Sequence, residues 1–402
     1  FETQRQVNEA VDHWRRAIQA RPRSFRAHNA LIKLLCANGR HAEAIELIRH
    51  ADVPMHSNGM AIEYNMGTLL LHEHPAKAIE FLDTARRRMG EVNNVQHNRA
   101  HCLETLGRYQ EAVEEWDNLL LREPDWDWPL LGRARSLAQL GRFDEAVADI
   151  RHLQKIQPGD PEVTRAAAGV FYEKGDHAAA LEALQALDAL QRIDNEYLHN
   201  LMGATYLHLG ELDKARPWFV KAIGLQPDSY RAHKNLAACL LKPHPVPRAD
   251  AREAIGYAEI AISLRPNLWL PRELRIKALM ALDRKDEVRQ MFEQWLSDQP
   301  AHMEGRQAYA LHLLNEGGPS AALAVAQFEK LMQQHGQHPY YAWGLGKALG
   351  LSGQVEPGKV WLNKAKQQYQ MNGESANVLI CVNTLAELDK PKSLIGRLFG
   401  RR

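Results

Sequence analysis

Two histidines four residues apart are the first pair in this sequence whose types and spacing could support metal chemistry. His97 and His101 lie one helical turn apart in "NNVQHNRAHCLETL" (93–106), so both imidazoles would project from the same face of a helix. A protein zinc site requires three or four ligands, and two histidines alone do not make one. We therefore predict no metal here and no other cofactor.

The sequence carries none of the common catalytic signatures. "GLGKALG" (344–350) resembles a phosphate-binding loop, but it lacks the G-x-x-x-x-G-K-[ST] spacing, and close packing between helices explains its glycines better. A nucleophile elbow, an H-E-x-x-H pair and a deaminase motif are also absent from the sequence. We therefore predict a protein that is not an enzyme.

Charge and cysteine content narrow the class of protein further. The 402 residues carry 50 lysines and arginines against 49 aspartates and glutamates, a net charge of +1 that gives no global attraction to nucleic acid or to a membrane. Cys36, Cys102, Cys239 and Cys381 are far apart and form no C-x-x-C pair, which is typical of reduced thiols. This favours a cytoplasmic location, with a periplasmic one as the alternative.

The elements that must position any site follow from an internal repeat. "GRYQEAVEEWDNLLLREP" (107–124), "GRFDEAVADIRHLQKIQP" (141–158) and "GELDKARPWFVKAIGLQP" (210–227) share a glycine, an alanine five residues later, a large apolar residue four after that, and a closing proline. Glycine suits a tight turn, and proline ends a helix because it lacks a backbone donor. The alanine recurs every 34 residues, at Ala10, Ala44, Ala78, Ala112, Ala146 and Ala180.

Each repeat is predicted to be a helical hairpin. Spacings of four and three residues place the alanine, the large residue and a second small residue on one face of the second helix. The small residues let two helix axes approach, and the large residue fills the space between them. A single unit of this kind cannot bury its apolar face alone, so successive repeats must stack.

This pattern resembles the tetratricopeptide repeat, a helix-turn-helix unit of 34 residues, over almost the whole chain. Its first-helix signature, a large residue followed by a small one, recurs in "EYNMGTLL" (63–70), "HNLMGATYL" (199–207), "HKNLAACLL" (233–241) and "AWGLGKALG" (342–350). The resemblance implies an all-α, right-handed α-solenoid of about ten to eleven hairpins whose first helices line a concave groove for a peptide or partner protein. We expect the second helix of a partial repeat at 5–22, hairpins near 25–58, 59–92, 93–126, 127–160, 161–195, 196–229, 230–268, 269–302, 303–338 and 339–372, a C-terminal capping helix at 374–389 and a basic amphipathic tail at 390–402.

Basic and amide side chains on the predicted first helices are candidates for partner binding. Windows of 14 residues that begin at 25, 59, 93, 127, 161, 196, 230, 269, 303 and 339 sum to a charge of +6. The tail from Lys390 onward carries +5, so the second helices and connections carry about −10 of the net +1. A basic groove attracts acidic peptides or a C-terminal carboxylate, and in related repeat proteins asparagines hold a peptide backbone. Ordinary solvated charges are the alternative interpretation. The candidates are Arg26, Asn29, Lys33, Asn98, His101, Arg135, Asn200, Arg231, Lys234, Asn235 and Lys277.

Aromatic residues gather near the predicted junctions between repeats. Residues of this kind usually pack one repeat against the next, whereas exposed ones would anchor a partner. Trp128 is the best anchor candidate because its position in the repeat points it toward the mouth of the groove. The set is Phe25, Trp126, Trp128, Tyr197, Tyr230, Trp269, Tyr340 and Tyr341.

The two ends and one insertion depart from the repeat. The first repeat is only half present, so either its first helix has been removed or Val7, Val11 and Trp14 pack directly on the next hairpin. "KPHPVPRAD" (242–250) adds an extended loop, which could contact a partner or be a tolerated insertion. In the tail, Leu394, Ile395, Leu398 and Phe399 form an apolar side and Arg397, Arg401 and Arg402 a basic side, so the tail is either a membrane- or partner-docking helix or a frayed end.

Three functions fit these observations. The first is a scaffold, without catalysis, that holds a partner protein or extended peptide in its groove. The second is a targeting or regulatory arm of an enzyme such as a glycosyltransferase, which a catalytic segment before Phe1 would favour. The third is a peripheral membrane assembly factor for polysaccharide secretion or pilus biogenesis. Nucleic acid is not expected as a partner, because stacking aromatics do not recur once per repeat along the groove.

Overall fold

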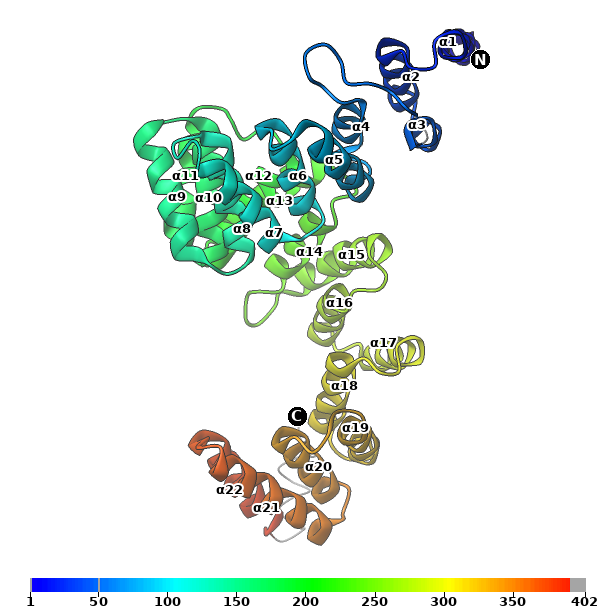
Figure 1. The fold of residues 1–402 in the computed structure, drawn as a ribbon. Coiled ribbons are helices and arrows are strands. Elements are labelled where there is room, and N and C mark those ends of the chain that lie inside the picture. The colour runs from blue at the N-terminus through cyan, green and yellow to red at the C-terminus, as the bar shows by residue number, and fades with distance from the viewer. Residues whose placement is uncertain (1, 50, 391–402) are drawn as a thin grey trace. The chain divides into compact units, whose positions relative to one another are not determined.

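The computed structural model describes residues 2–49 and 51–390, and all regular secondary structure there is helical (Figure 1). The predicted all-α class is therefore confirmed. The helices are α1 (Glu2–Ala20), α2 (Phe25–Ala37), α3 (His41–Arg49), α4 (Ile62–Leu70), α5 (Pro75–Met89), α6 (Asn93–Thr105), α7 (Tyr109–Leu120), α8 (Asp127–Gln139), α9 (Phe143–Ile156), α10 (Pro161–Lys174), α11 (His177–Ala189), α12 (Glu196–His208), α13 (Leu212–Leu225), α14 (Tyr230–Leu240), α15 (Arg248–Leu264), α16 (Leu270–Ala281), α17 (Lys285–Asp298), α18 (Met303–Glu316), α19 (Ser320–His335), α20 (Pro339–Leu351), α21 (Val355–Met371) and α22 (Ser375–Leu388).

Ten helical hairpins follow one another in the described part of the chain, from α2 and α3 to α20 and α21. The even-numbered helix of each pair is the first helix of the repeat, and the odd-numbered one is the second. Contact clustering divides the chain into two compact units, unit 1 (Phe1–Pro227) and unit 2 (Asp228–Arg402). Within each unit a helix packs mainly against the helices before and after it, as a repeat architecture requires.

The glycine of the repeat forms the turn between the two helices of a hairpin. Gly107 has a φ of 72°, a left-handed conformation that a side chain would disfavour. Its N–H donates to the carbonyl of Glu104 at 3.0 Å, and the N–H of Arg108 donates to the carbonyl of Leu103 at 2.9 Å. These bonds satisfy the last carbonyls of α6 and allow α7 to begin at Tyr109.

Small and large residues meet in the core between successive helices, both within a hairpin and between neighbouring hairpins. Ala112 and Trp116 of α7 are 0% and 1% exposed. The indole of Trp116 lies directly against Gly132 of α8, where an added Cβ would come within 2.5 Å of the ring. Glycine in the first helix therefore makes room for the large residue of a second helix. The same type of contact joins Gly67 to Leu82, Gly203 to Phe219, Gly305 to Trp295 and Gly344 to Phe328.

The N-terminal helix α1 packs directly on the hairpin of α2 and α3. Val11 is 1% exposed and belongs to the same core cluster as Leu31, while Val7 and Trp14 pack against that cluster as half-buried residues. Val7, Val11 and Trp14 therefore pack directly on the next hairpin. At the other end, α22 contacts α20 and α21 at the position predicted for the capping helix.

Two further expectations concern the ends of the fold and the insertion. The tail residues Leu394 to Arg402 lie outside the described residues. The first six residues of the insertion "KPHPVPRAD" (242–247) lie in the connection between α14 and α15, whereas its last three residues (248–250) form the first turn of α15 and correct the predicted extent of the loop. Over the described ranges, no helix combines the length and the apolar character that a bilayer crossing requires.

Candidate functional site

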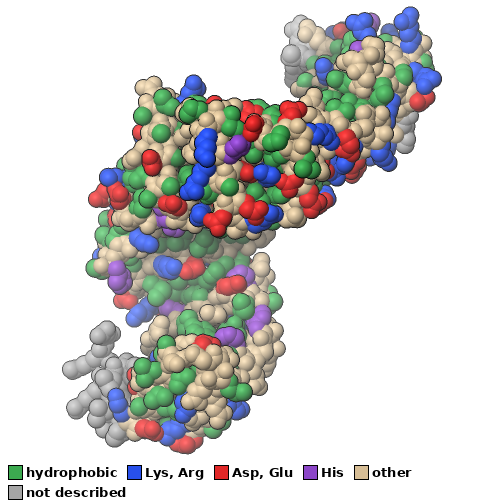
Figure 2. All heavy atoms as spheres, turned by 60° about the vertical axis from the view of Figure 1, so that its left-hand side comes forward, with side chains coloured by type: hydrophobic (Ala, Val, Ile, Leu, Met, Phe, Trp, Pro, Cys, Tyr) green, Lys and Arg blue, Asp and Glu red, His purple; other side chains and the backbone are tan. Residues whose placement is uncertain are grey.

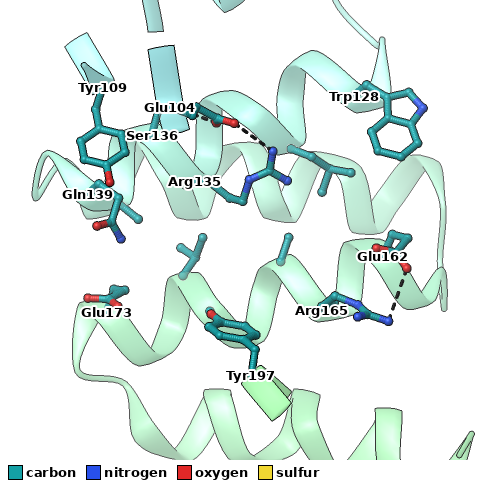
Figure 3. A pocket seen from close by; sticks show the side chains of 15 residues that line it. Glu104, Tyr109, Trp128, Arg135, Ser136, Gln139, Glu162, Arg165, Glu173 and Tyr197 are labelled. Atoms are coloured by element: carbon teal, nitrogen blue, oxygen red, sulfur yellow. Dashed lines mark hydrogen bonds and ion pairs between the residues drawn. The ribbon is translucent and has the colours of Figure 1, made fainter. Parts of the chain in front are cut away.

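A hollow of about 340 Å³ lies between the first helices α8 and α10 of unit 1 (Figure 3). Side chains of α8 reach toward α10 across the opening, and Tyr197 at the start of α12 approaches from the far side. We call this hollow the α8–α10 pocket. It is lined by Glu104, Tyr109, Trp128, Leu131, Arg135, Ser136, Ala138, Gln139, Glu162, Arg165, Ala166, Gly169, Val170, Glu173 and Tyr197.

The floor of the α8–α10 pocket is apolar because of how α8 and α10 pack. Leu131 and Ala138 of α8 face Ala166 and Val170 of α10, and three of these four residues are buried. Gly169 keeps the floor open, since a Cβ there would lie 3.3 Å from the Tyr197 hydroxyl. An apolar floor under a polar rim is the usual construction of a pocket for a ligand side chain.

Trp128 and Tyr197 flank this floor and remain exposed. The exposed fraction is 55% for Trp128 and 45% for Tyr197, which is unusual for aromatic residues in a repeat protein whose other rings are packed. The remaining six junction aromatics are half-buried or buried, so packing between repeats, the commoner role, accounts for them. The two exposed rings come from different hairpins and line the same pocket.

Ion pairs and hydrogen bonds hold the polar rim of the pocket. Arg135 contacts Glu104 of the preceding repeat at 3.2 Å, and the hydroxyl of Ser136 donates to the same carboxylate at 2.9 Å. Arg165 lies 3.5 Å from Glu162 and 3.7 Å from Asp194. The lining therefore contains more carboxylates than guanidinium groups, and it is not basic.

A second hollow, of about 440 Å³, shares Glu104, Trp128 and Arg135 with the α8–α10 pocket and extends to α6. His97 and His101 line it, and the ring of His97 lies edge-on to Trp116 at 5.3 Å. Burial lowers the pKa of both histidines, and each is further lowered by the positive charge of Arg135. The two imidazoles are therefore neutral at neutral pH and can exchange hydrogen bonds with a ligand. We call the two hollows together the first-helix groove.

Several predicted asparagines form bonds between neighbouring first helices. The amide of Asn65 on α4 donates to the Asn29 carbonyl oxygen on α2 at 2.8 Å, and the amide of Asn98 on α6 donates to the Thr68 hydroxyl at 3.0 Å. Asn200 is only 8% exposed, so it offers little surface to a ligand. One polar group of Asn29 and one of Asn98 thus already serve the stacking of repeats.

The predicted basic residues lie in two separate places. Arg26 and Lys33 are exposed on α2 in unit 1. Arg231 is exposed on α14 in unit 2, near Lys234, whose pKa is lowered first by burial and then by the charge of Arg231. Asn235 is half-buried on the same helix, and Lys277 on α16 is paired with Glu273 at 2.6 Å. The structure therefore brings His101, Trp128 and Arg135 together in the lining of one groove, and the other candidates are not among the residues that line it.

Basic and acidic side chains are intermingled over the face of the molecule that Figure 2 shows. A separate basic wall is not visible on that face. Window charges in the sequence describe whole helices, whereas the field at a surface depends on which side chains pair across neighbouring helices. Arg135 with Glu104 and Lys277 with Glu273 are examples of such pairs.

Sequence reasoning missed part of the pocket. Tyr197 was expected only as a junction aromatic, and Arg165, Glu162 and Glu173 of α10 were not selected. Their spacing could have identified them, because positions 162, 165, 166, 169 and 173 are related by steps of three and four residues and therefore lie on one face of a helix. Glycine and alanine at 169 and 166 within that face indicate a surface left open above the helix.

The comparisons with known proteins agree with this architecture. Tetratricopeptide repeat models match residues 1–54 and 131–193 and, separately, residues 197–229. No curated protein matches the chain.

Solved structures with a similar fold cover most of the chain. A human IFIT1 dimer with m7Gppp-AAAA has a TM-score of 0.58 at 16% identity and covers 92% of this chain and 91% of its own. A tetratricopeptide repeat protein from Parabacteroides merdae has a TM-score of 0.53 at 16% identity, covering 63% of this chain and 98% of its own. The APC/C hetero-tetramer Cut9-Hcn1 has a TM-score of 0.51 at 13% identity, covering 87% and 74%.

These identities are low, so the likeness concerns the fold. The recurring turn glycine, the small and large residues that meet between helices, and the family models that match three segments lead to one assignment. The chain contains tetratricopeptide repeats and has the fold of a tetratricopeptide repeat protein.

Proposed function

We propose that this protein is a non-catalytic scaffold that binds an extended segment of a partner protein in the first-helix groove of unit 1. The observation that carries the proposal is that two exposed aromatic residues, Trp128 and Tyr197, line one pocket with an apolar floor. Exposed aromatic residues beside a preformed apolar pocket are the side chains that dominate binding energy at protein interfaces.

The pocket fits one large apolar side chain of the partner. Burying a leucine or phenylalanine side chain stabilises a complex by roughly 1.5–3 kcal/mol, which is about a tenfold to hundredfold gain in affinity. The rim would then orient the peptide backbone through the amide of Gln139 and the paired groups of Glu104 and Arg135. Neutral His101 in the neighbouring hollow supplies a further donor or acceptor along the same path.

The charge of the groove argues against a nucleic acid as its ligand. Carboxylates of Glu104, Glu162 and Glu173 line the pocket beside only two arginines, and a phosphate backbone requires an excess of positive charge. The RNA in the IFIT1 structure belongs to that protein, and the 16% identity does not extend it to this chain. A protein ligand with an apolar anchor is the better match.

A photo-crosslinking experiment tests the site directly. A photoreactive amino acid at Gln139, on the rim of the pocket, is compared with the same amino acid at Lys155, an exposed position on the second helix α9. After irradiation in native lysate, the crosslinked partner is identified by mass spectrometry. Its affinity is then measured for the wild type, Trp128→Ala and Tyr197→Ala.

We expect a partner that crosslinks from Gln139 and not from Lys155, and a loss of affinity of at least about tenfold for each aromatic variant. Circular dichroism should show both variants folded, because the two rings are exposed. Equal crosslinking from both positions, or full affinity in both variants, would refute the groove as the binding site.

We further propose that unit 2, considered by itself, binds an acidic peptide segment through Arg231 and Lys234. Arg231 and Lys234 lie close enough for their charges to repel, and neither forms an ion pair with a carboxylate in the described part of the chain. A bound carboxylate would relieve this repulsion. An Arg231→Ala, Lys234→Ala variant should therefore weaken binding of a glutamate-rich peptide and reduce its salt dependence. A salt-independent affinity, identical in wild type and variant, would contradict this part of the proposal.

A further inference from the structure

Three metal-ligand side chains from two different hairpins converge near the N-terminal end of unit 1. One potential ligand atom from each of His41, Glu73 and His74 lies within 4.8 Å of the other two. Nε2 of His41 is 3.3 Å from a carboxylate oxygen of Glu73, and the His41 and His74 rings have centroids 4.9 Å apart. His41 is 8% exposed, while Glu73 and His74 are open to solvent. We call these three residues the His41 cluster.

The backbone on both sides of the cluster is fixed by ordinary repeat geometry. His41 is the first residue of α3, directly after the turn in which Gly39 has a φ of 69°. His74 precedes Pro75, the first residue of α5; its N–H donates to the Leu70 carbonyl, and its own carbonyl accepts from Ala78, each at 2.9 Å. Two ligands therefore sit on rigid turns, and only the exposed side chains must adjust.

Four of the other nine hairpins share a pattern at the position of His74 that His74 does not follow. The residue before the second helix is an arginine in four other hairpins, and it forms an ion pair with a glutamate three residues later. In α5 that position is His74, and the residue three later is Lys77, so the usual pair cannot form. The imidazole contacts His41 of the previous hairpin instead. The four regular pairs are Arg40–Glu43, Arg108–Glu111, Arg142–Glu145 and Arg284–Glu287.

We propose that the His41 cluster is a binding site for a zinc-class divalent transition ion. Two imidazoles and one carboxylate are a common protein ligand set for Zn²⁺, and they leave a fourth position open. Ligand atoms around a tetrahedral zinc lie about 3.3 Å apart, so Glu73 and His74 must close by at most about 1.5 Å. Both are exposed and can make this movement at small cost.

The fourth position needs a ligand from outside the group of three. The Cys36 thiol lies at the end of α2, where burial and the charge of Glu73 raise its pKa to about 11. Either this thiol or a water molecule would complete the tetrahedron. A bound ion would join the hairpin of α2 and α3 to that of α4 and α5, at the point where a long connection separates α3 from α4.

Zinc titration of the purified, tag-free protein tests the site. The protein is first treated with EDTA and exchanged into metal-free buffer, and Zn²⁺ binding is measured by calorimetry at neutral pH. Co²⁺ is added in a parallel experiment, because its visible absorption reports the coordination number and thiolate ligation. We expect one strong site, whose affinity falls as the pH is lowered, since the imidazoles must be neutral to bind.

The variants separate this site from adventitious binding. His74→Arg introduces the arginine that four other hairpins carry at this position. Glu73→Gln removes an exposed carboxylate without disturbing the core. Each should weaken the strong site at least tenfold. His152→Ala is the matched control, because His152 and Asp125 form a similar pair at 2.7 Å that belongs to no three-ligand group in the described residues.

Cys36→Ser identifies the fourth ligand, because it abolishes thiolate absorption of the Co²⁺ form only if the thiol is bound. The proposal is overturned if wild type shows no strong site. It is also overturned if His74→Arg and Glu73→Gln bind Zn²⁺ as tightly as His152→Ala does. If His41 and Glu73 form only an ion pair, Zn²⁺ should not change the stability of the protein, and the variants should bind Zn²⁺ as the control does.

Discussion

Replacing Gly132 with alanine should destabilise unit 1, although alanine is the better helix former. A Cβ at this position of α8 would lie 2.5, 2.6 and 2.8 Å from three atoms of the Trp116 indole. Ordinary carbon contacts are about 3.5–4.0 Å, so the ring would have to retreat by about 1 Å. Trp116 is 1% exposed, so a shift of its ring would disturb the close-packed contacts that it makes in the core.

Two opposing effects determine the magnitude. Overpacking a core typically costs about 1–3 kcal/mol, and exchanging glycine for alanine inside a helix returns about 1 kcal/mol. The net effect at Gly132 is therefore a loss of up to about 2 kcal/mol. Gly256→Ala, at a helical position of α15 with no atom near the added Cβ, provides the matched control and should gain about 0.5–1 kcal/mol.

The measurement must be local, because repeat proteins need not unfold in one step. Hydrogen–deuterium exchange of peptides from α7 and α8 reports the opening free energy at Gly132, and peptides from α15 report it at Gly256. We expect faster exchange in the first variant and slower exchange in the second. If hydrogen exchange became slower by the same factor in Gly132→Ala and Gly256→Ala, the contact with Trp116 would not require Gly132. That result would refute the packing argument.

Three further predictions follow from the described contacts. Ala146→Leu should destabilise the α8–α9 hairpin by about 1–3 kcal/mol, because Ala146 is 0% exposed; an unchanged denaturation midpoint would contradict this register. Arg133→Ala should cost roughly 2–3 kcal/mol, since it leaves the 7% exposed Asp149 without its two hydrogen bonds of 2.7 and 2.9 Å, and a near-neutral result in urea denaturation would argue against it. Burial lowers the pKa of His97 below 6.5, so the unfolded state binds more protons between the two pKa values and stability falls as the pH drops from about 7 to 5. His97→Gln should reduce this slope, and identical slopes for wild type and variant would count against the assignment.

The sequence determined the repeat unit and most of the fold, for local physical reasons. Helix faces follow from three- and four-residue spacings, so the apolar face that carries Ala112 and Trp116 could be predicted from one segment of chain. The turn glycine and the closing proline act within a few residues and marked the ends of the helices. Trp128 could also be selected, since its place in the repeat pointed to the groove.

Only the tertiary structure decided which side chains meet. The rotation from one hairpin to the next brings Tyr197 over the floor beside Trp128, pairs Arg135 with Glu104, and engages Asn98 with Thr68. The summed charge of a helix does not predict the pairs Arg135–Glu104 and Asn98–Thr68, because in each pair the partner side chain is about one repeat away in the sequence. The contact of His41 with His74 has the same origin: both histidines are visible in the sequence, but the stacking of two turns is what places their rings together.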